Sequence, residues 1–161
     1  MKYRRLTLEE LSHFEKEFIN FLAINGISPE VWEEIKNENS DRINNLLDQF
    51  SDLVFEKVLQ NIRFLEHRTP KDLKVFKCMP DRIKLIGIIV DRQSQLDLTQ
   101  QAWQQQILET LQQGNGNEVR IYAAEKSYKT TREEELFNMV SSGCFVVDES
   151  LFQSLESLHS S

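Results

Sequence analysis

The chain has 161 residues, of which 40% are hydrophobic and 28% are charged, and its formal net charge at pH 7 is −7. This length and this apolar content suit one compact folded domain and exclude a disordered polymer. The longest apolar run, Leu85 to Val90, is far shorter than the roughly 20 residues that a membrane span requires, so no membrane association is expected.

The N-terminal part of the chain has a helical pattern. Thr7 and Glu10 have the T-x-x-E spacing of a capping box, and apolar residues at helical spacing follow them. This first helix is expected to end at Gly26, because glycine readily adopts the left-handed conformation that follows a helix. Ser28-Pro29 predicts the start of a second, short helix, and Ser40-Asp41 predicts the start of a third, longer one.

The middle of the chain has the pattern of a β-meander. Three β-rich runs are separated by turn residues, and they cover Ile62 to Arg68, Leu73 to Met79 and Arg82 to Asp91. The third run is apolar on both faces, which predicts an interior strand at the centre of the sheet.

The C-terminal part alternates between helical and strand patterns. The expected elements are a helix over residues 99–113, a strand over 118–124, a helix over 131–142, a strand over 144–147 and a final amphipathic segment over 151–158. Such alternation favours parallel strands joined by right-handed crossovers.

These patterns together predict an α+β fold in a single domain that spans residues 1–161. A layer of three helices over 1–60 is expected to pack on a mixed sheet of about five or six strands. The meander over 61–92 and a β-α-β-α-β half over 93–161 would supply those strands.

Two cysteines, Cys78 and Cys144, lie far apart in the chain, and neither has a second Cys or a His at metal-ligand spacing. They are interpreted as small buried residues in a reducing compartment, which favours a cytoplasmic location. Cys144 is expected at the entry to a buried strand, where a thiol is inert. No cofactor is expected.

The basic charge is concentrated in the meander, where residues 61–92 hold eight basic and four acidic residues between two acidic flanks. One interpretation is that Lys and Arg protect edge strands from pairing with other chains. The other is a positive surface that docks an acidic protein partner or a small anionic ligand. Nucleic acid is disfavoured, because the net charge of the chain opposes the approach of phosphates. The candidate binding residues are Arg63, His67, Arg68, Lys74, Lys77 and Lys84.

The sequence offers weaker signals for catalysis. The Gly114-Asn115-Gly116-Asn117 loop follows a helix instead of a strand, so it predicts a helix end and a turn, not a phosphate-binding loop. Asp91 and Asp148 each follow a strand, and two carboxylates at neighbouring strand ends can hold a metal ion. Against a metal site, aspartate is common at strand exits, and Asp148 can cap the last helix.

Three stretches of the chain carry a resemblance. The opening MKYRRLT, the segment FSDLVFEKVLQNIRFLEH from Phe50 to His67 and the ending GCFVVDESLF together resemble an uncharacterised family of small bacterial proteins. The resemblance covers nearly the whole chain and implies a cytoplasmic protein of one domain. It implies no catalytic residue, because the family has no assigned activity.

Two functional hypotheses follow. The favoured one is a non-enzymatic binding or adaptor module that docks an acidic partner or anionic ligand through the basic meander. The alternative is a small metal-dependent or small-molecule enzyme that acts at the strand ends near Asp91 and Asp148.

Overall fold

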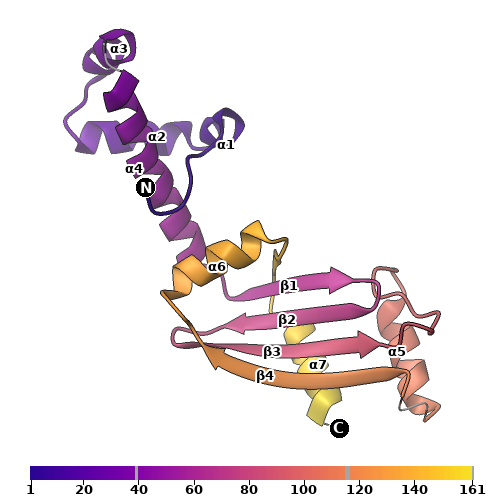
Figure 1. Cartoon of the computed structure of the whole chain (residues 1–161). Helices are drawn as coiled ribbons and strands as arrows, with labels where there is room; N and C mark the ends of the chain where they lie inside the picture. The colour runs from indigo at the N-terminus through magenta and orange to yellow at the C-terminus, as the bar shows by residue number, and fades with distance from the viewer. Residues whose placement is uncertain (39, 115–116, 161) are drawn as a thin grey trace. The chain divides into compact units, whose positions relative to one another are not determined.

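A computed structural model describes residues 1–38, 40–114 and 117–160 of the chain (Figure 1). The chain forms two compact units, Met1–Gln60 and Asn61–Ser161, which are described separately below. The α+β class predicted from the sequence is confirmed. Helices precede a five-stranded sheet in the chain, and further helices lie between its later strands and after the last one. The assignment of residues 1–161 to a single domain stays a prediction.

The first unit is helical. Its helices are α1 (Leu8–Ser12), α2 (Glu15–Ile24), α3 (Pro29–Glu38) and α4 (Ser40–Gln60). Aromatic contacts join three of them, because the ring of Phe18 on α2 lies 5.4 Å from Trp32 on α3 and 4.9 Å from Phe50 on α4. Burial of such large rings supplies much of the apolar stabilisation of a small helical unit.

The expected first helix is two helices in the structure. The capping box at Thr7 and Glu10 is present as predicted, but α1 ends after five residues. The chain tightens there, because the amides of His13 and Phe14 donate to carbonyls three residues earlier instead of four. Phe14 then packs against the apolar core of the unit and precedes α2. No glycine or proline marks this break, so residue pattern alone did not predict it.

The residues before α1 are tied to α4. The carboxylate of Asp52 accepts the backbone N–H groups of Lys2 and Tyr3 at 2.7 and 3.0 Å. Arg5 donates to Asp48 at 2.6 Å, and Arg4 forms two hydrogen bonds with Glu10 at 2.8 and 2.9 Å. Both arginines therefore hold the first residues of the chain against its own helices.

The second unit is built on one antiparallel sheet with the strand order β4-β3-β2-β1-β5. The strands are β1 (Phe64–Thr69), β2 (Asp72–Cys78), β3 (Arg82–Val90), β4 (Val119–Ser127) and β5 (Phe145–Val147). The expected meander is confirmed as β1, β2 and β3. The third run is an interior strand as predicted, but β2 and not β3 occupies the centre.

One face of this sheet carries the larger apolar core, and the other face is buried where Leu65, Cys78 and Ile83 lie. Leu73 and Val75 on β2 lie opposite Ile88 and Ile86 on β3, and all four are buried. They pack with α5 (Trp103–Gln112) and α7 (Ser150–Ser160), and Figure 1 shows α7 behind the strands. Since successive residues of a strand point to opposite faces, this packing determines which residues face away from the helices.

The expected parallel crossovers are wrong, because β4 pairs antiparallel with β3 and β5 pairs antiparallel with β1. The connection from β3 to β4 runs through α5 and begins and ends at the same end of the sheet. There the amide of Asp91, just after β3, donates to the carbonyl of Glu118, just before β4. A helix of ten residues is about 15 Å long, whereas β3 with nine residues is about 30 Å long. The helix is too short to return the chain to the start of β3.

The strand β5 is an exposed edge and not the buried strand that the sequence predicted. It has three residues paired with β1, and Phe145 and Val146 are 71% and 60% exposed. The helix before it, α6 (Arg132–Ser141), is joined to the meander by Arg132, whose guanidinium donates to the carbonyls of Ile62 and Cys78.

Glycines end two helices as expected. Gly26 after α2 and Gly114 after α5 have φ values of +75° and +76°, in the left-handed region that glycine favours. The following Asn115 and Gly116, which belong to the predicted turn, lie outside the described residues. Within the described ranges, no helix has the length and apolar character needed to cross a bilayer.

The ion pair at the capping box predicts a pH dependence of stability. Hydrogen bonds from Arg4 and from the backbone of Thr7 lower the pKa of Glu10 to about 2. Because this pKa is below that of the unfolded chain, about 4.3, the charged carboxylate stabilises the fold above that value and the effect is lost as the pH falls toward 2.

We expect Glu10→Gln to lower the free energy of unfolding at pH 7 by less than about 1 kcal/mol, because the ion pair of Glu10 with Arg4 is partly exposed. The difference between variant and wild type should shrink between about pH 4 and pH 2. Circular dichroism melts across this range measure it, and a difference that is constant with pH would contradict the assignment.

Candidate functional site

Four strands place a row of side chains on the sheet face opposite α5 and α7, which we call the outer face. His67 on β1 lies directly across from Lys74 on β2, Lys74 lies across from Gly87 on β3, and Gly87 lies across from Tyr122 on β4. The row therefore crosses the sheet perpendicular to its strands. His67, Lys74 and Tyr122 are all partly exposed.

Gly87 allows the ring of Tyr122 to lie over the backbone of β3. A Cβ atom on this glycine would be 2.5 Å from the hydroxyl oxygen of Tyr122, closer than any side chain tolerates. The glycine does not have a positive φ, so its role is close approach and not a turn. The phenol consequently extends across β3 toward Lys74.

Lys74 is the charged centre of the row. Its ammonium donates to Asp72, two residues earlier on the same strand and face, at 2.9 Å. This hydrogen bond is the main reason that the pKa of Lys74 is raised, and the negative charges of Asp72 and of the ionised forms of Tyr122 and Cys144 add to the effect. The lysine remains an ammonium at neutral pH.

Cys144 lies at the β1 end of the row. The pairing of β1 with β5 ends at Glu66 and Phe145. Because the two strands are antiparallel, Cys144, the residue before Phe145, lies at the level of His67. Partial burial raises the pKa of the Cys144 thiol, and the charge of Lys74 counteracts only part of that rise. Burial likewise raises the pKa of Tyr122. Both groups keep their protons at neutral pH.

The chemistry of the row suits an anion. At neutral pH it presents an ammonium, a phenol and a thiol, all of which can donate hydrogen bonds. Nucleophilic catalysis requires the opposite protonation state, because thiolates and neutral amines are the reactive forms. The arrangement therefore favours recognition of a negatively charged group over covalent chemistry.

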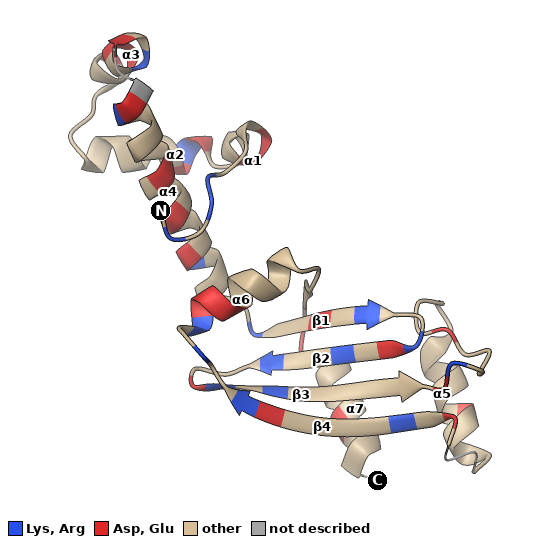
Figure 2. Ribbon diagram, in the orientation of Figure 1, with Lys and Arg blue, Asp and Glu red and all other residues tan. Residues whose placement is uncertain are grey.

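The predicted basic residues do not form one surface. Only His67 and Lys74 of the six candidates are placed in the row. Register places Arg68, Lys77 and Lys84 on the helix-covered face, and Figure 2 shows basic positions along β1, β2 and β3. Arg63 is exposed just before β1, where its carbonyl accepts the amide of Cys78.

Most basic residues of the meander do not lie on an edge of the sheet. β4 forms one edge, and β5 pairs with β1 only from Phe64 to Glu66, so Arg68 on β1 lies beyond that pairing. Several serve the fold instead. Arg68 stacks on Trp103 at 5.1 Å and donates to Glu66 at 2.6 Å, and Lys71 donates to the carbonyl of Ser94 at 2.6 Å.

The two carboxylates proposed for a metal site do not meet. β3 and β5 run in opposite directions in the sheet, so Asp91 and Asp148, which follow them, lie at opposite ends. Asp91 accepts the amide of Gln93 at 2.9 Å. Asp148 accepts hydrogen bonds from Ser150 at the start of α7, and these lower its pKa. The part of the chain that the structure describes contains no group of three metal-binding side chains.

Sequence reasoning missed Gly87, Tyr122 and Asp72, and it assigned Cys144 to the core. The alternation of Lys74 with buried Leu73 and Val75 is visible in the sequence and places Asp72 on the same face as the lysine. The pairing of β4 with β3 is not visible there, and it alone brings Tyr122 over the glycine.

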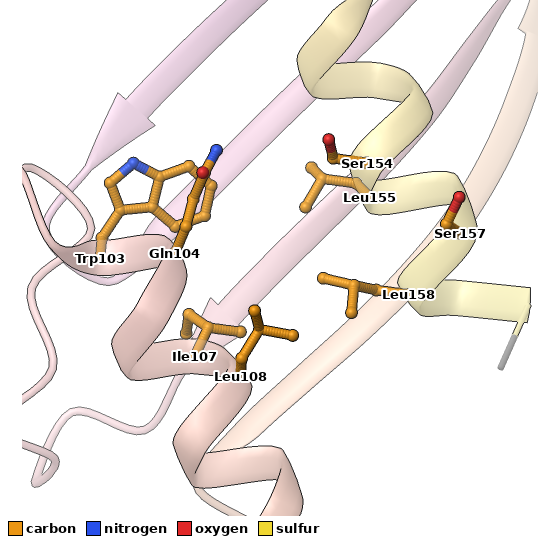
Figure 3. Close-up of a pocket in the computed structure, with 8 residues that line it drawn as sticks. All are labelled: Trp103, Gln104, Ile107, Leu108, Ser154, Leu155, Ser157 and Leu158. Carbon is orange, nitrogen blue, oxygen red and sulfur yellow. The ribbon is translucent and has the colours of Figure 1, made fainter.

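A concave feature of the second unit lies between α5 and α7. This groove of about 400 Å³ is lined by Trp103, Gln104, Ile107, Leu108, Ser154, Leu155, Ser157 and Leu158. Figure 3 shows the side chains of the two helices directed toward each other across it. Every lining residue is uncharged, so the groove suits a neutral, largely apolar molecule and offers no positive charge to an anion.

Comparison with known proteins identifies one family. Residues 1–160 match the family described as "Family of unknown function (DUF6495)". The chain belongs to this family. No curated protein and no solved structure matches the chain. The resemblance to an uncharacterised family is therefore confirmed, and the family supplies no activity for the residues of the row.

The contact of Gly87 with Tyr122 can be tested by a double-mutant cycle. We expect Gly87→Ala to cost about 1–3 kcal/mol of unfolding free energy, because the methyl group displaces the ring. In a Tyr122→Ala background the same change should cost less than about 1 kcal/mol, since the three atoms nearest to the added methyl group all belong to the ring and hydroxyl of Tyr122. Urea unfolding of the four proteins gives the coupling energy, and additive costs would contradict the contact.

Proposed function

We propose that this protein is a binding module that holds a carboxylate group of an acidic partner or ligand on the outer face of its sheet. The observation that supports the proposal most is the row His67, Lys74, Gly87 and Tyr122, with Cys144 at its end. Lys74 is the charged donor of this site. The phenol of Tyr122 is the second donor, and it is directed toward the lysine because position 87 lacks a side chain.

Asp72 gives the site a means of discrimination. It holds the ammonium of Lys74 in the absence of ligand, so an incoming carboxylate must compete with it or share the same ammonium. A partly exposed ion pair of this kind is worth little to stability and is readily exchanged. A ligand that also contacts Tyr122 gains a hydrogen bond that Asp72 does not provide.

Apolar side chains beside the row supply contact area for a partner. Phe76, Leu85 and Ile89 belong to the same face as Lys74 by register and are partly exposed. Interfaces commonly combine such apolar surface with a few charged or polar groups that set orientation. The net charge of −7 disfavours nucleic acid as the anionic partner.

Two lysines on the same strand provide a matched test. Lys74 and Lys77 both lie on β2, but Lys74 faces outward and Lys77 lies over the ring of Phe152 on the opposite face. We expect Lys74→Met to weaken binding of a fluorescein-labelled oligoglutamate peptide at least about fivefold, because an ion-paired hydrogen bond is lost. Lys77→Met, with the same loss of charge, should bind within about twofold of wild type.

Fluorescence anisotropy at low and moderate salt provides the measurement, and citrate serves as a competing small carboxylate. Competition by citrate at the same site would assign the site to small ligands as well as to acidic peptides. Equal weakening of peptide binding by both lysine variants would show that only the net charge matters, and it would contradict the proposal. Failure of wild type to bind either carboxylate would contradict it as well.

A further inference from the structure

A groove in the first unit lies between α2 and α3. It has a volume of about 650 Å³. Its residues on α2 recur at intervals of three and four, which is one face of that helix, and those on α3 do the same. The lining residues are Glu15, Phe18, Ile19, Leu22, Ala23, Gly26, Ile27, Ser28, Pro29, Trp32 and Glu33.

The groove is lined mostly by apolar residues, and the charged residues among those that line it are Glu15 and Glu33. Phe18, Leu22 and Trp32 line it, and Ile19 is 56% exposed although its side chain is apolar. Glu15 lies on the first turn of α2, which is the turn furthest from the Gly26 connection, and Glu33 lies near the middle of α3. The residues that line the groove are all described, and they include no lysine or arginine.

The charge around the groove has the same sign. The two helices together carry six glutamates and two lysines. Glu33 has an ion pair with Lys36 at 3.5 Å, but both side chains are largely exposed, so the pair leaves the carboxylate available. A ligand that places apolar side chains between these helices therefore meets negative potential from Glu15 and Glu33.

We propose that this groove binds a basic amphipathic helix of a partner protein. The apolar face of such a helix would lie between α2 and α3 beside Ile19, and its Lys or Arg side chains would reach Glu15 and Glu33. Apolar side chains at intervals of three and four are the usual anchors when a helix binds in a groove. The opposite charge of helix and groove determines which partners are accepted.

The test uses the full chain and a fluorescein-labelled model helix of about 18 residues, with leucines on one face and lysines on the other. A second helix, with glutamates in place of the lysines, measures the charge requirement. We expect the basic helix to bind in fluorescence anisotropy and the acidic helix not to bind.

Two pairs of variants on the same helices separate the groove from the general surface. Glu15→Lys/Glu33→Lys should weaken binding of the basic helix at least about fivefold. Glu17→Lys/Glu38→Lys makes the same change of net charge at exposed residues that do not line the groove, and it should have a clearly smaller effect. Ile19→Ser should weaken binding, whereas Ile24→Ser should not, because Ile24 is 86% exposed outside the groove.

All four variants alter exposed residues, so each should remain folded, and circular dichroism confirms this. Equal effects within either pair would overturn the proposal, as would absence of binding to wild type. A dimer of wild type that Ile19→Ser dissociates in analytical ultracentrifugation would also overturn it, because the groove would then be occupied by a second copy of the chain.

Discussion

The register of β2 against its two neighbours determines the chemistry of the second unit. Leu73 and Val75 are completely buried beneath α5 and α7, and a slip of one residue would place Asp72 and Lys74 in that core instead. Burial of charge is far more costly than loss of a few hydrogen bonds, so the register is strongly specified. The same register determines which residues lie on the outer face, because alternate residues of a strand point to opposite faces. Apolar packing on one side thus aligns the polar row on the other.

Local sequence patterns predicted the elements well and their pairing poorly. Capping residues, glycine helix ends and β-rich runs depend on neighbours in sequence, and Thr7, Gly26 and Gly114 adopt the expected roles. The orientation of β4 and β5 depends on where α5 and α6 deliver the chain, which no local pattern records. The error in strand direction also produced the error in the metal site, since Asp91 and Asp148 were expected to meet only if their strands were parallel neighbours.

The charges of the meander show why a basic segment is a weak predictor of a basic surface. Strand alternation divides its lysines and arginines between two faces, and the fold uses several of them internally. Arg68 covers an indole ring, and Lys71 satisfies a loop carbonyl. Lys74 differs, because its immediate neighbours are groups that a ligand can also contact. A functional lysine or arginine is distinguished by the groups that surround its side chain and not by its positive charge alone.

The edge strand β5 gives the sheet a region of low local stability. Three residue pairs join it to β1, and its release exposes little new apolar surface because Phe145 and Val146 are already largely in solvent. Opening of this edge therefore requires far less free energy than opening of β2, and its amide hydrogens should exchange sooner. Cys144 precedes this strand directly. Full exposure of this partly buried thiol therefore requires local opening of the edge and not global unfolding.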